Sequence, residues 1–489
     1  MKSRLLISSY QLGERACCRE GINFIKMALA ATVRATFDIA RGNLLTLSLC
    51  MILIFSAYLV ATYIRLSHVP GPLLAAFTNI VRLRWVLTRK AQYIHIDLHR
   101  KYGPLVRIGP NTVSVGDPAE IQQIYGLTGS YAKSDFYPVL QPHAKGAAMP
   151  GLFNTQDENL HRILKRPIAS IYSMSNLVGF EPYVDSTMSV FFNELDKRFA
   201  KTGDVCDLGV WLQRFAFDVI GEITFSRRLG FLEGAQDVDG IMHSIWHHFE
   251  RAAPVGQIPW VDKLLDKNRL LAWIWPPPTS PIVRFATERA DERKDRSPSE
   301  NEQLNNRDFL SRFIEAKSKD EKTPSWALTA WTTSNVLAGS DTTAILLRTI
   351  LYNLLKHPQT LDRLQLELQQ TADEGGFSED ETVAWSEAKD LPYLDACIKE
   401  AGRLHPPFGL QLERIVPSGG ATICDKRLEA GTVVGINAWV AHRDETVFGP
   451  NACVWDPQRW LCEDEDRRKL MDRSLLTVSP SKQQTLGPH

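Results

Sequence analysis

The sequence predicts a mainly α-helical protein with a small β portion, preceded by an N-terminal membrane-spanning helix. Residues 44–64 form an uncharged apolar run long enough to cross the core of a bilayer. Long amphipathic patterns dominate from about residue 155 onward, whereas short alternating segments such as residues 104–116 are typical of strands. Of the 489 residues, 44% are hydrophobic and 23% are charged, so most of the chain should be globular and ordered.

Three parts are predicted along the chain: an extension over residues 1–43, a transmembrane anchor over 44–64 and a globular domain over 65–489. A buried core helix is the alternative interpretation of the apolar run. The charged residues that follow the run are basic from Arg65 to Lys90, and no acidic residue appears before Asp97. This basic excess predicts that the domain after the helix faces the cytoplasm. The extension is basic too, and Met27 is an alternative start.

Proline positions and periodicity predict the remaining elements. Prolines 70 and 72 predict a stiff connection after the apolar run, because each proline fixes its own φ. Prolines 276–278 and the charged stretch 288–308 interrupt the helical pattern, and this stretch should be a surface loop or a solvated helix end. Residues 325–356 lack proline and predict one helix more than about 45 Å long. Helices near 359–372 and 391–404 follow, then extended pieces at 421–424 and 430–436.

Composition excludes some classes of function. The net charge is zero, which gives no electrostatic footprint for nucleic acid. The eight cysteines are scattered, without C-x-x-C pairs or histidines at zinc spacing. This pattern favours a reducing compartment over a disulfide scaffold.

Residues 338–343, Ala-Gly-Ser-Asp-Thr-Thr, stand in the middle of the long predicted helix. Glycine there costs about 1 kcal/mol relative to alanine, so Gly339 needs a reason. Hydroxyl and carboxyl side chains can bond the preceding turn and widen the helix. A groove floored by Ala338 and Gly339 could then hold a diatomic ligand or water, with Thr342 donating a hydrogen bond and Asp341 relaying protons. The alternative is a kink whose polar groups face solvent.

Glu400 and Arg403 stand three residues apart on a predicted helix and can share one face. Neighbouring leucines and Ile398 suggest that the pair is partly buried, where each charge needs its partner. An ordinary surface ion pair is the alternative.

These two motifs, in this order and at this separation, resemble those of the cytochrome P-450 monooxygenase family. Residues 455–460, Trp-Asp-Pro-Gln-Arg-Trp, match the family's aromatic-x-Pro-x-Arg segment, which implies that Arg459 joins Glu400 and Arg403 in a structural triad. Residues 161–166 match the helix that holds the haem propionates, which implies that His161 and Lys165 bind them, with Arg166 as the near alternative. Residues 134–137, 172–175 and 441–444 are similar to fungal members of the pisatin demethylase type.

The resemblance extends from the apolar run to about residue 477 and implies the P-450 fold with a haem cofactor. It implies a membrane-anchored enzyme of fungal secondary metabolism that inserts one oxygen atom from O2 into an apolar small molecule. Electrons would come from NADPH through a cytochrome reductase, and the anchor would lie in the endoplasmic reticulum membrane with the domain facing the cytoplasm. Substrate contacts would come from residues 136–140, 241–260 and 408–410, for which core packing is the alternative.

One departure from the family pattern concerns the haem ligand. The family places F-x-x-G-x-x-x-C-x-G about twenty residues beyond the Pro-x-Arg segment, where the cysteine thiolate binds the iron. Residues 474–477 lead up to this loop, but residues 478–489 differ from it, and Thr485 stands near the cysteine position. Cys462 precedes four acidic residues, which raise a thiol pKa, and Cys453 has no better setting, so no metal ligand is predicted.

We therefore expect a P-450 domain that is truncated at its C-terminus. A haem-free remnant, acting at most as a membrane-tethered binding or interaction protein, is the alternative function. The substrate, the regioselectivity and the pathway do not follow from the sequence.

Overall fold

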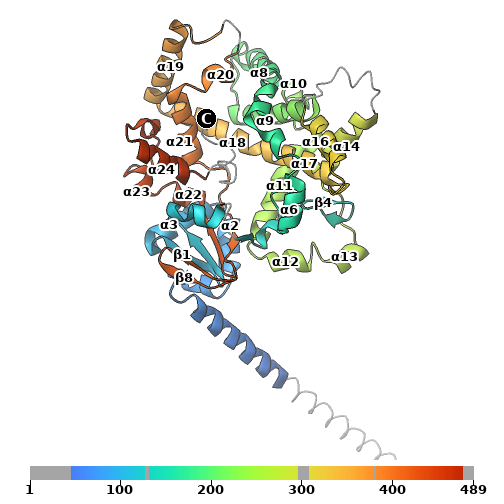
Figure 1. The fold of residues 1–489 in the computed structure, drawn as a ribbon, viewed down its shortest axis with the longest axis vertical. Helices are drawn as coiled ribbons and strands as arrows, with labels where there is room; N and C mark the ends of the chain where they lie inside the picture. Colours follow the sequence, from blue (N-terminus) through green and yellow to red (C-terminus); the bar gives the residue numbers. More distant parts are fainter. Residues whose placement is uncertain (1–45, 127–130, 296–307, 379–381, 477–489) are drawn as a thin grey trace, which may run out of the picture. The chain divides into compact units, whose positions relative to one another are not determined.

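The computed structural model describes residues 46–126, 131–295, 308–378 and 382–476 (Figure 1). The chain forms two units, Met1–Arg65 and Leu66–His489. In the first unit, Thr46–Arg65 form a 20-residue helix that is long and apolar enough to cross a membrane. This helix covers most of the apolar run predicted over residues 44–64. The predicted extension over 1–43 lies outside the described residues.

The second unit is mainly helical with a small β portion, which confirms the predicted fold class (Figure 1). Its longer helices are α3 (Ala91–Tyr102), α8 (Glu181–Leu195), α9 (Leu208–Phe225), α11 (Ile241–Val255), α14 (Pro281–Asp295), α16 (Phe309–Lys319), α17 (Ala327–Gly339), α18 (Asp341–Lys356), α19 (Pro358–Asp373), α21 (Pro392–Leu404) and α24 (Glu465–Ser474). Its shorter helices are α2 (Ile80–Leu87), α4 (Ile121–Tyr125), α5 (Phe136–Val139), α6 (Glu158–Lys165), α7 (Met174–Leu177), α10 (Phe231–Gly234), α12 (Pro259–Leu264), α13 (Arg269–Ile274), α20 (Trp385–Ala388), α22 (Ala438–Ala441) and α23 (Glu445–Phe448).

The sheet portion contains the predicted hairpin and returns from late in the chain. Strands β1 (Leu105–Gly109) and β2 (Thr112–Val115) pair antiparallel, with Leu105 opposite Val115. Strand β9 (Val433–Ile436) pairs parallel with β2, and β6 (Arg414–Ile415) and β3 (Ala132–Lys133) complete the order β1-β2-β9-β6-β3. Two separate pairs are β4 (His143–Ala144) with β5 (Ala147–Ala148), and β7 (Ala421–Ile423) with β8 (Lys426–Leu428).

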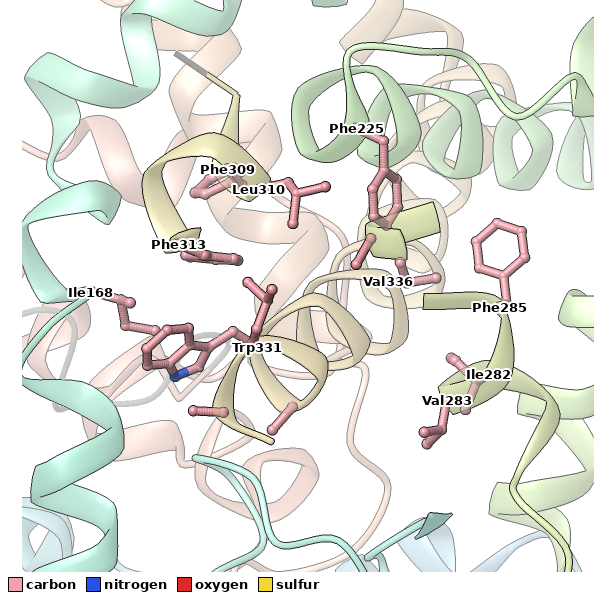
Figure 2. Close-up of a cluster of buried hydrophobic side chains, with 14 of the residues drawn as sticks. Ile168, Phe225, Ile282, Val283, Phe285, Phe309, Leu310, Phe313, Trp331 and Val336 are labelled. Atoms are coloured by element: carbon pink, nitrogen blue, oxygen red, sulfur yellow. The ribbon is translucent and has the colours of Figure 1, made fainter. Parts of the chain in front are cut away.

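The largest apolar core joins helices from the middle of the chain. Figure 2 shows Phe225 of α9, Phe285 of α14 and Phe313 of α16 around Trp331 and Val336 of α17. Trp331 is 1% exposed, and its Nε1 donates a hydrogen bond to the carbonyl of Leu164 at 3.1 Å. This bond fastens α6, which carries His161 and Lys165, to the central helix α17.

Two predictions about helices need correction. The single helix predicted over 325–356 is interrupted at Ser340, which separates α17 from α18. The described ends of the stretch 288–308 are not simply solvated. Residues 288–295 are the last part of α14, and Asp308 is the N-cap of α16. Arg293 of α14 pairs with Asp308, and both side chains are buried. Prolines 276–278 do separate α13 from α14, as predicted.

Candidate functional site

Hydroxyl side chains surround the interruption of the central helix. The Ser340 Oγ donates to the carbonyl of Val336 at 2.8 Å, and the Thr342 Oγ1 donates to that of Ala338 at 2.6 Å. These are the bonds to the preceding turn that the sequence predicts. Ala338 is exposed although most of α17 is buried. The break therefore presents a small-residue surface at the middle of the domain, where a ligand could approach the helix.

Gly339 has a packing reason within the fold. A Cβ built on it would lie 2.7 Å from the Cδ1 of Ile220, which is on α9. Helix α9 therefore approaches α17 more closely than a larger residue would allow. This contact with Ile220 does not test the prediction that Ala338 and Gly339 floor a binding groove, which stays a prediction.

Asp341 is held by two partners that the sequence did not reveal. Its Oδ1 accepts a hydrogen bond from Gln213 Nε2 at 2.5 Å, and the Gln213 Oε1 accepts one from Arg348 at 2.9 Å. Burial raises the pKa of Asp341 above its usual value, although Gln213 and Arg348 partly offset this effect. A carboxyl group with a raised pKa is better able to hold and release a proton near neutral pH.

The predicted triad comes together around one buried carboxylate. Arg403 donates to both oxygens of Glu400 at 2.7 and 2.8 Å, and Arg459 Nε donates to Oε1 at 3.1 Å. The side chains of Glu400 and Arg403 are 0% exposed. Trp460 Nε1 and the backbone N–H of Asp456 each donate to the same carboxylate at 3.0 Å. The pair is therefore fully buried, and no oxygen of Glu400 lacks donors.

His442 links this triad to the last described residue. Its Nδ1 donates to the carbonyl of Arg403 at 3.0 Å, so its Nε2 accepts from the backbone N–H of Leu476 at 2.7 Å. Burial lowers the pKa of His442 to about 3, which keeps the ring neutral and suits this one-donor, one-acceptor arrangement. Sequence reasoning missed His442, although residues 441–444 were noted as similar to a subgroup.

Positive charges gather beside α6. Lys133 Nζ donates to the carbonyl of Leu152 at 2.9 Å. Burial and the charges of Arg414 and Lys165 together lower the pKa of this amine to about 8, although the carboxylate of Glu158 acts in the opposite direction. Burial also lowers the pKa of His161, with Lys133 as the largest charge effect. The sequence predicted His161 and Lys165 but missed Lys133 and Arg414, which come from strands β3 and β6. We call these four residues the cationic cluster.

Arg166 differs from its neighbour Lys165. It is the C-cap of α6 and is exposed, whereas Lys165 is half-buried and lowers the pKa of Lys133. Lys165 therefore belongs to the cationic cluster, and the assignment of Lys165 or Arg166 to the haem propionates stays a prediction.

The three segments predicted to contact substrate pack against one another. Phe136, Tyr137 and Leu140 form an apolar cluster with Ala252 of α11, and Leu410 packs against it. Residues 136–140, 241–260 and 408–410 therefore each contribute to one cluster. Most of these side chains are buried, so packing alone explains their apolar character.

The two cysteines considered as alternative ligands have local partners. Arg100 donates to the Sγ of exposed Cys453 at 3.6 Å, and the Cys462 Sγ donates to the carbonyl of Asp464 at 3.6 Å. The ligand position itself, near Thr485, lies outside the described residues, as does the predicted truncation.

Comparison with known proteins decides the family. A model of the cytochrome P-450 family matches residues 69–475. The chain belongs to the cytochrome P-450 family. It is 51% identical over 441 residues to a cytochrome P-450 monooxygenase of Aspergillus terreus, which covers 90% of this chain and 89% of that protein. The cytochrome P-450 monooxygenase cicH of Emericella nidulans is 48% identical over 440 residues, covering 89% and 88%.

A third relative is longer than this P-450. The cytochrome P-450 monooxygenase mpaDE of Penicillium roqueforti is 44% identical over 443 residues, which are 90% of this chain and 52% of that protein. The narrower resemblance to the pisatin demethylase type stays a prediction.

Membership of the cytochrome P-450 family implies a haem cofactor, O2, a small-molecule substrate and a redox partner. The cationic cluster fits the two carboxylates of haem, because several half-buried positive charges repel one another and an anion would stabilise them. The exposed break at Ala338 offers a surface of small side chains that a flat apolar ring system could approach. The described residues therefore fit haem on its propionate side.

Proposed function

We propose that this cytochrome P-450 is a membrane-anchored haem-thiolate monooxygenase that inserts one oxygen atom from O2 into an apolar small molecule in fungal secondary metabolism. Electrons would come from NADPH through a cytochrome reductase. One observation carries the proposal: α6, with His161 and Lys165, is bonded through Leu164 to the same central helix that carries the Ala338–Thr342 interruption. The proposed site for the anionic cofactor and the proposed site for small-molecule chemistry would then stand on two joined helices.

In this proposal His161 and Lys165 hold the haem propionates, with Lys133 and Arg414 adding positive charge and Arg166 as the near alternative. Haem would supply the activation of O2 and the transfer of one oxygen atom to the substrate, a chemistry for which the family uses a cysteine thiolate on the iron, and Thr485 stands near the position of that cysteine in this chain. Ala338 and Gly339 provide the small surface beside which O2 and substrate would lie. Arg414 is kept in place by its bond to the Tyr137 hydroxyl and by contacts with the rings of Tyr125 and Tyr137.

Asp341 and Thr342 are proposed to deliver protons. The carboxyl group of Asp341 has a raised pKa and lies next to Thr342, whose hydroxyl now donates to the carbonyl of Ala338. Rotation of the Thr342 hydroxyl would release that bond and allow donation towards the exposed side of the break. Gln213 holds the Asp341 carboxylate in one orientation while this occurs. Glu400, Arg403 and Arg459 would act structurally, because their polar atoms are bonded to one another and to backbone groups.

Membrane attachment is proposed through the helix Thr46–Arg65, with the P-450 domain on the cytoplasmic side of the endoplasmic reticulum membrane. Its length, its mean hydropathy of 2.2 and the basic residues that follow it support this proposal. The P-450 domain also exposes large apolar side chains on α12, α13 and the residues after them. Trp273 is 84% exposed and Trp275 is 73% exposed. Such side chains are typical of surfaces that meet a bilayer or a partner.

Haem uptake and the spectrum of the reduced protein under carbon monoxide test this function. The full chain is purified in detergent or nanodiscs after expression with a haem precursor. The proposal expects bound haem and a Soret band at the position typical of thiolate ligation. Bound haem with a different Soret position would contradict the monooxygenase assignment, and failure to take up haem would favour the haem-free alternative.

A further inference from the structure

Two histidines lie one turn apart on the outer face of α11. His243 and His247 are both exposed. Their rings are nearly parallel, with centroids 6.4 Å apart and an angle of 8° between the ring planes. Side chains four residues apart are neighbours on the surface of a helix. Solvent and its ions therefore reach both imidazole rings at one place on the domain.

The ring nitrogens of this pair are not used by the fold. Within the described part of the chain, His243 makes its hydrogen bonds through backbone groups only, and the side chain of His247 makes none. A neutral imidazole has one nitrogen that donates a hydrogen and one that carries a free lone pair. The pair thus offers two unused lone pairs on neighbouring side chains.

The backbone beneath the two rings is firmly held. Ile241 is 2% exposed and Ile245 is 1% exposed, and both pack into the largest apolar core on the opposite face of α11. The Asp237 carboxylate accepts the backbone N–H groups of Met242 and His243, each at 3.0 Å, at the start of the helix. A ligand that joins the two rings therefore has to order only two side chains, which keeps the entropic cost of binding small.

A second histidine pair at the same spacing shows what the α11 pair has in addition. His95 and His99 lie on α3, but His95 is 5% exposed and burial lowers its pKa to about 3. The His99 Nδ1 and Nε2 are hydrogen-bonded to the carbonyl of Gly103 and to the Oγ of Ser114, each at 2.9 Å. Of these two pairs, the one on α11 combines the spacing with accessible and unengaged nitrogens.

We propose that His243 and His247 form a binding site for a divalent transition-metal ion such as Zn²⁺. Imidazole nitrogens suit Zn²⁺, Ni²⁺ and Cu²⁺, whereas Mg²⁺ prefers oxygen ligands. Two histidines at positions i and i+4 on one helix face are a known zinc-binding arrangement. A bound zinc ion lies about 2.0–2.1 Å from each nitrogen, so the two rings approach each other through small side-chain rotations, which exposed side chains make readily.

The site has two protein ligands. Glu250 stands three residues after His247 on the same stripe of α11, but its carboxylate pairs with Arg89. Among the described residues, no cluster of three or more His, Cys, Asp and Glu side chains is arranged to hold a metal ion. Water molecules complete the coordination of the ion, which is bound at the surface and links two successive turns of α11. This site is separate from the cationic cluster and does not depend on the proposed function.

Zinc titration of the full chain tests the proposal. Isothermal titration calorimetry measures Zn²⁺ binding to the untagged protein in nanodiscs at pH 7.5, where histidine is mostly neutral, with protein-free nanodiscs as the reference. The variants H243Q and H247Q should each weaken the binding of one ion by at least about tenfold, because attachment at one point replaces attachment at two. Mg²⁺ in place of Zn²⁺ should show no binding that these variants change.

Two control variants separate the site from histidine content in general. H405Q removes an exposed histidine that has no second histidine one turn away, and it should bind Zn²⁺ like the wild type. S244H/H247Q keeps two histidines on α11 but places them next to each other, where side chains do not share a helix face, and it should bind as weakly as H247Q.

Three results would overturn the proposal. The first is an unchanged Zn²⁺ affinity in the H243Q/H247Q double variant. The second is a loss in H405Q as large as the loss in H247Q, which would mean that scattered histidines bind the metal. The third is wild-type affinity in S244H/H247Q, which would show that the spacing of His243 and His247 is not what creates the site.

Discussion

Replacing Glu400 with glutamine should destabilise the folded domain by about 4 kcal/mol. The carboxylate accepts five hydrogen bonds, three of them from the guanidinium groups of Arg403 and Arg459. Glutamine keeps one acceptor oxygen, turns the other position into a donor and removes the negative charge. Two buried positive charges are then left without their counter-charge, and breaking a buried pair in this way costs about 3–5 kcal/mol. This loss is a large fraction of the total stability of an ordinary domain.

Urea denaturation of the full chain in detergent, followed by far-UV circular dichroism, measures the effect. The matched control is Glu315→Gln. Glu315 pairs with Lys319 one helical turn away, as Glu400 pairs with Arg403, but the Glu315–Lys319 pair lies on the surface. The side chains of that pair are 63% and 70% exposed, and solvent screens exposed charges, so this control should unfold like the wild type. If E400Q lowers the free energy of unfolding by less than about 1 kcal/mol, the reasoning is refuted. Such a result would mean that water stabilises the charges of Arg403 and Arg459 in place of the Glu400 carboxylate.

Three further predictions follow from buried groups. His442 alone should make the free energy of unfolding fall by about 1.4 kcal/mol per pH unit as the pH drops from 6.5 towards 3, because burial lowers its pKa to about 3 while an unfolded histidine takes up its proton near 6.5. Burial also lowers the pKa of His95 to about 3 and that of His99 to about 4, so these residues add to the slope. The H442Q variant should therefore reduce the measured slope by about 1.4 kcal/mol per pH unit, and an unchanged slope would count against the assignment. Asp218→Asn should cost about 2 kcal/mol in urea denaturation, since its carboxylate accepts four backbone N–H groups at the start of α10, and a neutral outcome would show that water replaces them. Lys133→Met should raise the pKa of His161 in an NMR titration, because Lys133 is the largest charge that lowers it, and no shift would mean that the two groups do not interact.

Local motifs in the sequence predicted the parts of the site whose geometry is set by short-range spacing. Glu400 and Arg403 are one helical turn apart, so their pairing follows from helix geometry alone. The hairpin over residues 104–116 likewise follows from alternation around a Gly-Pro turn. For Arg459 the resemblance to a family was needed, because nothing in its own surroundings points to Glu400.

The missed residues are those that the fold brings from far away. Lys133 and Arg414 lie on neighbouring strands, β3 and β6, that are far apart in the chain, and their shared effect on α6 appears only after the sheet has formed. Gln213 reaches Asp341 because α9 crosses α17 closely at Gly339. No periodicity or composition signal marks such residues, since each is an ordinary polar side chain in its own segment.

The break at Ser340 shows why the prediction of one continuous helix over residues 325–356 was wrong. Residues 325–356 lack proline and are mostly good helix formers, so periodicity predicts continuity. Hydroxyl groups that bond the preceding turn at Ser340 and Thr342 instead interrupt the helix by one residue. The sequence indicated these bonds but not their effect on the helix boundary.

Haem titration of the purified full chain tests the central claim most directly. Soret absorbance is followed as haem is added to the wild type and to the variants K133M and R414M, which remove two charges of the cationic cluster. The account predicts saturable uptake of one haem per chain, with weaker binding in both variants because an anion loses its counter-charges. No saturable uptake by the wild type, or equal affinity in all three proteins, would contradict it.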